Sequence, residues 1–183
     1  MVSSFKALAQ QVFWSPPSVG FKINVDAAID SSRKCFGVGI VIRDCQGDLI
    51  FVAAMFFDLL FGIEAAELTG ILLGIRWALS LNLALVVVDF DALNMVRLCA
   101  GLSFTCSDLD NIVQDIHFLL EMYSWLSIAF VPRLGNNVAH CVVKWAVWNS
   151  SSCCWASSFP DWLLKLVKRE TAPGVSCASC GSD

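Results

Sequence analysis

The order in which the hydrophobic patterns follow one another constrains the fold of this chain most. Three strand-like runs come first, over Phe21–Ala28, Gly37–Arg43 and Leu49–Phe57, and their short connections predict an antiparallel meander. The pattern then changes, because Ala, Leu and Ile dominate Gly62–Leu81 and the few charged residues there stand three or more positions apart. Such a segment predicts one long helix.

The second half of the chain alternates between strand and helix patterns. The continuous apolar run over residues 83–90 predicts a buried strand of the parallel type. Ser107 and Asp110 form a capping-box-like start for a later helix. The remaining predictions are helices around 92–100 and 108–123, a strand over 125–131, a helix over 137–148, a Ser/Cys-rich loop at 150–158 and a short amphipathic or irregular end at 159–169.

This order of elements predicts an α/β domain. Three antiparallel strands followed by two strands of the parallel type give a mixed five-stranded sheet flanked by helices. A Pro/Gly-rich turn precedes the first strand, so we predict a tail over 1–19, the domain over 20–150 and a C-terminal extension over 151–183. Gly70 and Gly74 lie on the same side of the long helix as Glu67, which predicts close approach to the sheet.

Three carboxylates stand in segments that are otherwise too apolar to tolerate charge. Asp26 lies in the first strand, Glu67 near the start of the long helix, and Asp91 after the run V-V-V-D-F. A carboxylate in apolar surroundings is costly unless it is paired, solvated or bound to a cation. Because Mg²⁺ prefers carboxylate oxygen, the three residues predict a divalent-metal site for phosphodiester chemistry.

Composition limits the partners that the chain can have. The net charge of −4 argues against strong non-specific binding to nucleic acid, although metal ions supply positive charge in a metal-dependent nuclease. No segment has the length of a membrane span and no secretory signal is evident, so we expect an intracellular protein without a membrane partner.

The nine cysteines form no disulfide framework and are expected to be reduced. Cys177 and Cys180 form a lone C-x-x-C, either a zinc pair or part of a flexible tail.

The chain resembles the ribonuclease H fold, and in particular the plant ribonuclease H-like domains related to retroelement reverse transcriptases. The resemblance extends from Trp14 to about Trp148 and rests on several segments in a fixed order. These are W-S-P-P-S-V-G-F-K-I-N-V-D-A-A, G-V-G-I-V-I-R-D-C-Q-G, E-A-A-E-L-T-G-I-L-L-G-I-R-W-A, V-V-V-D-F-D-A and V-P-R-L-G-N-N-V-A-H.

The resemblance implies a hydrolase that cuts the RNA strand of RNA–DNA hybrids with two Mg²⁺ ions, or with Mn²⁺. It places the family's three acidic ligands on Asp26, Glu67 and Asp91, and a fourth acidic position on His140. Since imidazole suits softer metals than Mg²⁺, we expect weaker activity with Mg²⁺ and a relative gain with Mn²⁺. A second departure is Ala27, where the family usually has Gly.

Several candidate residues keep a structural alternative. Asp91 also suits a helix N-cap, Glu64 is the alternative to Glu67, and His140 is also typical of a packed or hydrogen-bonded residue. His117 in the segment I-H-F-L-L is interpreted as structural, and Asp89 as a neighbour that supports the ligands.

Three further residues are candidates for contact with the substrate or for orienting the site. Arg133 and Asn136 match the family's R-x-x-N, which either orients the last helix or touches phosphate. Asn24 lies on the same strand face as Asp26, where it suits a substrate-facing position.

Two functions therefore compete. The first is a metal-dependent endonuclease of the ribonuclease H type, favoured by the complete set of Asp26, Glu67 and Asp91. The second is a catalytically weakened or inactive nucleic-acid-binding or interaction module of the same fold, favoured by the net negative charge, Ala27 and His140. A zinc or redox protein is a third hypothesis and rests only on Cys177 and Cys180.

Overall fold

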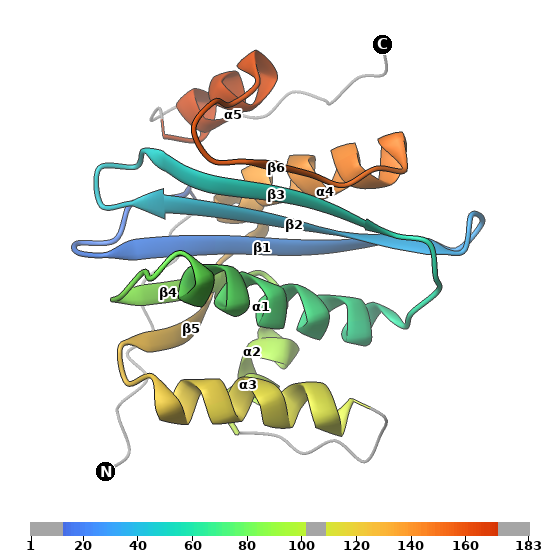
Figure 1. Ribbon diagram of the computed structural model, residues 1–183, viewed down its shortest axis with the longest axis horizontal. Helices are drawn as coiled ribbons and strands as arrows, with labels where there is room; N and C mark the ends of the chain where they lie inside the picture. Colours follow the sequence, from blue (N-terminus) through green and yellow to red (C-terminus); the bar gives the residue numbers. More distant parts are fainter. Residues whose placement is uncertain (1–12, 102–108, 172–183) are drawn as a thin grey trace.

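The computed structural model describes residues 13–101 and 109–171 (Figure 1). Its strands are β1 Phe21–Asp30, β2 Cys35–Asp44, β3 Leu49–Phe57, β4 Val86–Phe90, β5 Leu126–Phe130 and β6 Cys153–Trp155. Its helices are α1 Ile63–Ser80, α2 Leu93–Cys99, α3 Asp110–Met122, α4 Asn137–Asn149 and α5 Asp161–Thr171, with a 3₁₀ turn η1 at Arg133–Asn136. The helix start predicted at Ser107 and the pair Cys177 and Cys180 lie outside the described residues.

The strands form one mixed sheet in the order β5-β4-β1-β2-β3-β6. As predicted, β1, β2 and β3 form an antiparallel meander, and β4 and β5 add to β1 in parallel. The predicted number of five strands is wrong, because Cys153–Trp155 within the expected loop pairs with β3 as a sixth strand. Three residues are too few to show a hydrophobic period, and this strand forms because the edge of β3 offers unpaired backbone groups.

Helices cover both faces of the sheet. Alternate residues of β1, β2 and β3 pack against α1 and α3 on one face, and the other residues of β2 and β3 pack against α4 and α5. Figure 1 shows α1 in front of the sheet and α4 behind it. Each face of the sheet therefore carries its own apolar core, and the predicted α/β class is confirmed.

The helix α1 lies close to the sheet, as its two glycines predict. A Cβ atom at Gly70 would lie 2.9 Å from a methyl group of Val25, and one at Gly74 would lie 3.0 Å from the other methyl group of Val25. Both distances are shorter than normal packing contacts. The absence of side chains at these positions therefore sets how closely α1 and its Glu67 approach β1.

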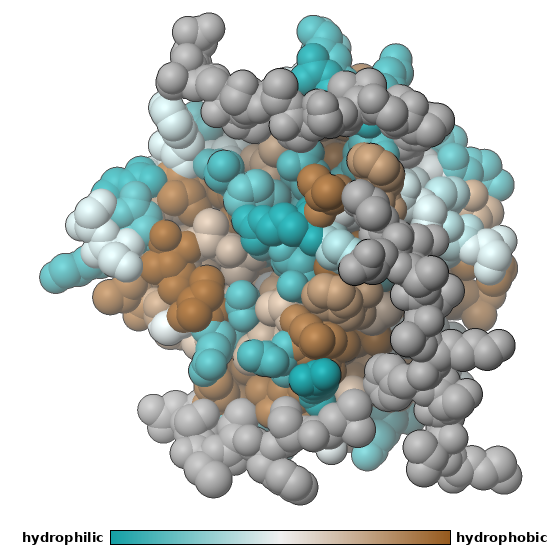
Figure 2. Space-filling view, turned by 180° about the vertical axis from the view of Figure 1, so that it is seen from behind, coloured by the Kyte–Doolittle hydropathy of each residue, from teal (hydrophilic) through white to brown (hydrophobic). Residues whose placement is uncertain are grey.

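The surface seen from behind mixes hydrophobic patches with hydrophilic side chains (Figure 2). Among the helices of the described residues, none is long and apolar enough to cross a membrane. Cys35 and Cys99 are buried free thiols, and burial raises the pKa of Cys99 to about 12.

Candidate active site

The strand register brings two of the predicted carboxylates to one place. In the parallel pair, Val25 of β1 lies beside Phe90, the last residue of β4. Asp26 follows Val25 and Asp91 follows Phe90. Because the two strands are parallel, both aspartates lie at the same end of the pairing between β1 and β4. Asp26 is only 3% exposed. The parallel pairing of β1 and β4 therefore positions both side chains.

A glycine in β2 brings the last helix to the same place. Gly39 is paired with Asp26, and a Cβ atom at Gly39 would collide with the carbonyl oxygen of Ala139 in α4. Without that side chain, α4 packs directly on the sheet. His140 consequently reaches across β2, and its Nδ1 atom lies 2.7 Å from Oδ2 of Asp26.

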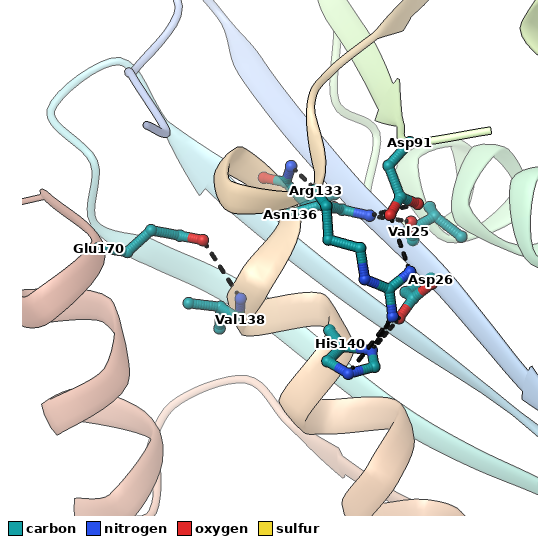
Figure 3. Close-up of polar contacts among 9 residues, drawn as sticks. Val25, Asp26, Asp91, Arg133, Asn136, Val138, His140 and Glu170 are labelled. Carbon is teal, nitrogen blue, oxygen red and sulfur yellow. Dashed lines mark hydrogen bonds and ion pairs between the residues drawn. The ribbon is translucent and has the colours of Figure 1, made fainter. Parts of the chain in front are cut away.

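Asp91 is held by two residues of the turn that precedes α4 (Figure 3). Its Oδ1 atom accepts a hydrogen bond of 3.2 Å from the side-chain amide of Asn136, and its Oδ2 atom accepts one of 3.0 Å from Nη1 of Arg133. The alternative role of Asp91 as a helix N-cap is wrong. Helix α2 has Ala92 at its N-cap and no side-chain capping bond, and both oxygens of Asp91 accept from the turn instead.

Glu67 of α1 lies within the electrostatic influence of the two aspartates. It is half-buried, and its pKa is raised to about 7, first by burial and then by the negative charges of Asp91 and Asp26. Glu64, the alternative at the start of the same helix, is exposed. These observations favour Glu67 over Glu64 as the third carboxylate of the cluster.

Two amides beneath the carboxylates are buried and fix the turn. Asn24 is 0% exposed and donates to Oδ1 of Asn136 and to the carbonyl oxygen of Gly135, at 3.1 and 3.2 Å. Asn136 in turn donates to the carbonyl oxygen of Val25 at 2.7 Å. Because all of these contacts are internal, the orienting alternative fits Asn24 and Asn136 better than contact with a substrate.

A buried ionic network supports Asn24 and was missed by the sequence analysis. Arg43 is 0% exposed and donates to Asn24 at 3.0 Å and to Glu170 of α5 at 2.7 Å. Trp14 donates its indole N–H to the same oxygen of Asn24 at 2.8 Å, and its ring lies 3.6 Å from the guanidinium carbon of Arg43. The signal that could have revealed the network is the single charged residue at the end of the apolar run G-V-G-I-V-I-R.

Glu170 ties the last described helix to the site. While one of its oxygens accepts from Arg43, the other accepts from the backbone N–H of Val138 in the first turn of α4, at 3.2 Å (Figure 3). The described part of the predicted extension over 151–183 therefore contacts both the sheet and the helix that carries His140. The division of the chain at residue 150 stays a prediction.

Two other residues have structural partners. The His117 ring lies 3.1 Å from the carbonyl oxygen of Leu98, in keeping with its interpretation as structural. Asp89 is buried and forms an ion pair of 3.1 Å with Lys22. Burial raises the pKa of Asp89, while the Lys22 ammonium opposes that rise. Among the described residues, Asp89 therefore pairs with Lys22 and forms no bond with Asp26, Glu67 or Asp91.

The chemistry of the donor set fits a divalent cation. Asp26 and Asp91 offer hard oxygen atoms, and the pKa of Glu67 is raised by burial and, to a smaller extent, by neighbouring carboxylates, whose repulsion a cation would relieve. Within residues 13–101 and 109–171, however, no group of three or more His, Cys, Asp or Glu side chains is gathered around one point as a finished metal site. The cation that contacts both aspartates is the guanidinium of Arg133.

A family model described as reverse transcriptase-like matches residues 24–146. The chain belongs to the reverse transcriptase-like family. The matched segment of this family contains all seven candidate residues, from Asn24 to His140, and ends before β6 and α5. No curated protein sequence matches the chain.

Solved structures show that this reverse transcriptase-like domain has the RNase H-like fold. RNase H1 from Halobacterium salinarum matches with a TM-score of 0.66 and 18% identity, over 70% of this chain and 98% of that one. LC11-RNase H1 in complex with an RNA/DNA hybrid matches with a TM-score of 0.64 and 18% identity, over 71% and 98%. The foamy viral protease-reverse transcriptase with an RNA/DNA hybrid matches with a TM-score of 0.59 and 14% identity, over 81% of this chain and 22% of that one. The narrower resemblance to plant members stays a prediction.

Proposed function

We propose that this domain is a metal-dependent endonuclease that hydrolyses the RNA strand of RNA–DNA hybrids. The observation that carries the proposal is that Asp26 and Asp91 follow the last pair of β1 and β4, with Glu67 of α1 near enough for both charges to help raise its pKa. Hybrid complexes of LC11-RNase H1 and of the foamy viral protein, which share the fold, support RNA–DNA hybrid as the nucleic-acid partner.

The candidate residues have distinct roles in this proposal. Asp26, Glu67 and Asp91 would hold Mg²⁺ or Mn²⁺, and such an ion, when bound, activates water and stabilises charge on phosphate oxygens. His140 would orient Asp26 through their contact of 2.7 Å, and Asn136 would orient Asp91 through its amide. The exposed Arg133 stands beside both aspartates, where it would meet a phosphate.

A binding module without turnover is the second candidate, and His140 favours it. An imidazole stands where the resemblance expects a fourth carboxylate, and imidazole is a poorer ligand for Mg²⁺. Ala27 does not add to this case. It pairs with Val38 inside the regular strand β1 and does not adopt a positive φ, so the conformational freedom of glycine is not required there.

Cleavage of a labelled RNA–DNA hybrid with Mg²⁺, and separately with Mn²⁺, tests the proposal. We expect Asp26→Asn to abolish cleavage, and Asp115→Asn to leave it unchanged because Asp115 is 58% exposed and pairs with Arg76 at the surface. A folded native chain that cleaves with neither metal would overturn the enzyme and favour the binding module.

The same assay with His140→Asp tests the metal preference. A carboxylate at this position should raise the rate with Mg²⁺ by about tenfold and reduce the relative advantage of Mn²⁺, because it supplies a hard oxygen donor. An identical rate and metal preference in the variant would show that His140 has no part in ion selection.

A further inference from the structure

The guanidinium of Arg133 lies among the side chains that are proposed to hold the metal ion. Its Nη1 atom is 3.0 Å from Oδ2 of Asp91, and its Nη2 atom is 3.9 Å from Oδ2 of Asp26. Figure 3 shows the Arg133 side chain extending from η1 toward both aspartates and His140. Arginine is always charged, so it neutralises part of the negative charge that the carboxylates bring together.

Arg133 also occupies one side of a candidate ligand oxygen of Asp91. The Oδ1 atom of Asp91 already accepts from Asn136, and the Oδ2 atom accepts from Arg133. Each oxygen keeps a second lone pair, but an ion on Oδ2 would lie beside the positive guanidinium of Arg133, which is 3.0 Å from that oxygen, and would be repelled by it. Asn136 is buried and has further bonds, whereas the Arg133 side chain is 59% exposed. Arg133 is the donor that can leave at lower cost.

The contact with His140 shows that this position of Arg133 is not fully satisfied. The Nδ1 atom of His140 lies 2.7 Å from Nη2 of Arg133 and also 2.7 Å from Oδ2 of Asp26. Arginine only donates and carboxylate oxygen only accepts, while one ring nitrogen carries either a hydrogen or a lone pair. His140 Nδ1 therefore cannot bond both partners at once: when Nδ1–H donates to Asp26, its contact with Arg133 holds no hydrogen bond.

We propose that Arg133 is an internal counter-cation that occupies the cluster in the ion-free protein and is displaced when a divalent ion binds. This inference rests on the proposed function, because it assumes the same metal site. Displacement removes the positive charge beside Oδ2 of Asp91 and the contact that competes with donation from His140 to Asp26. A positive charge that stayed in place would repel the incoming ion, so Arg133 lowers the affinity of the site for divalent ions.

Calorimetric titration of the full chain with Mn²⁺ tests this role without relying on cleavage. We expect Arg133→Gln to bind Mn²⁺ at least about tenfold more tightly than the native chain, because one competing charge is removed close to the ion. Arg133→Lys keeps the charge but loses the planar fork, and its affinity should fall between the two. In EDTA, Arg133→Gln should also unfold at a lower temperature, since the carboxylates lose their counter-charge.

Two matched variants locate the effect. Arg76→Gln removes one positive charge from an exposed ion pair outside the cluster and should leave Mn²⁺ affinity unchanged. Asp26→Asn should abolish binding and so assign the titrated site. Unchanged or weaker binding by Arg133→Gln, when the native chain binds Mn²⁺ and cleaves hybrid, would overturn the role of Arg133 alone. No Mn²⁺ binding by either chain would overturn the proposed metal site together with this inference.

Discussion

Glu67 shows how its neighbours change the chemistry of one side chain. Burial, followed by the charges of Asp91 and Asp26, raises its pKa from 4.5 to about 7. A carboxyl group whose pKa is higher in the folded state takes up a proton on folding. Its contribution to stability is therefore complete below about pH 4.5 and is lost as the pH rises through 7.

The direction of this pKa shift leads to a prediction for the ion-free protein. In EDTA, the free energy of unfolding of the native chain should fall between pH 5 and pH 8, and Glu67→Gln should remove part of that fall because glutamine does not titrate. Urea unfolding at several pH values measures both. Glu121→Gln is the matched control, since Glu121 is exposed and is not among the charges that raise the pKa of Glu67, so it should leave the pH dependence as in the native chain. Equal pH dependence in Glu67→Gln and the native chain would contradict the prediction.

At the scale of elements, the packing of α4 on β2 decides whether His140 reaches Asp26. Gly39 makes this packing possible, because an added Cβ atom would meet the carbonyl oxygen of Ala139 and, at 2.7 Å, the backbone nitrogen of Val143. Both are backbone atoms of a packed helix, which cannot rotate away as a flexible side chain does. The contact between His140 and Asp26 consequently depends on Gly39, which has no side chain and no functional group of its own.

We predict that Gly39→Ala lowers the free energy of unfolding by about 2 kcal/mol, the usual cost of overpacking in a core. It should also reduce hybrid cleavage, because α4 is pushed away from Asp26. Gly62→Ala is the control, since a Cβ atom there meets nothing within 4 Å. Urea unfolding and the cleavage assay provide the two measurements. A Gly39→Ala chain as stable and active as Gly62→Ala would show that α4 accommodates the methyl group.

At the scale of the whole molecule, one buried ion pair connects segments far apart in the chain. Arg43 of β2 meets Glu170 of α5, while Trp14 covers the guanidinium. Burial lowers the pKa of Arg43 and raises that of Glu170, so for each group desolvation outweighs the attraction of its partner. The pair itself is therefore no strong source of stability, although the loss of one member leaves the other charge buried alone.

Glu170→Gln should accordingly reduce the free energy of unfolding by about 3 kcal/mol or more. The effect should extend to the site, because Arg43 supports Asn24 and Glu170 holds the first turn of α4. Asp115→Asn, which breaks the exposed pair with Arg76, should cost less than about 1 kcal/mol. Chemical denaturation compares the two variants, and similar small losses in both would show that Arg43 finds another partner.

The residue patterns were sufficient for most of the fold. Hydrophobic periods predicted β1 to β5 and α1 to α4, because each has a face or a continuous run that must be buried. They failed at β6, where three residues pair with the edge of β3 through backbone bonds that no side-chain pattern records. The candidate carboxylates were found because charge in an apolar segment is conspicuous. Glu170 was missed because it lies in a charged segment, K-R-E, that resembles solvated surface.

Local hydrophobic period and the cost of burying charge were enough to predict the α/β class, the order of the main elements and the carboxylates in apolar segments. Which side chains meet depends instead on the tertiary structure. The parallel register of β1 and β4, the packing of α4 over Gly39 and the turn carrying Arg133 bring Asp26, Asp91, Arg133 and His140 together across long stretches of chain. Such contacts depend on the geometry of the sheet, which no single segment encodes.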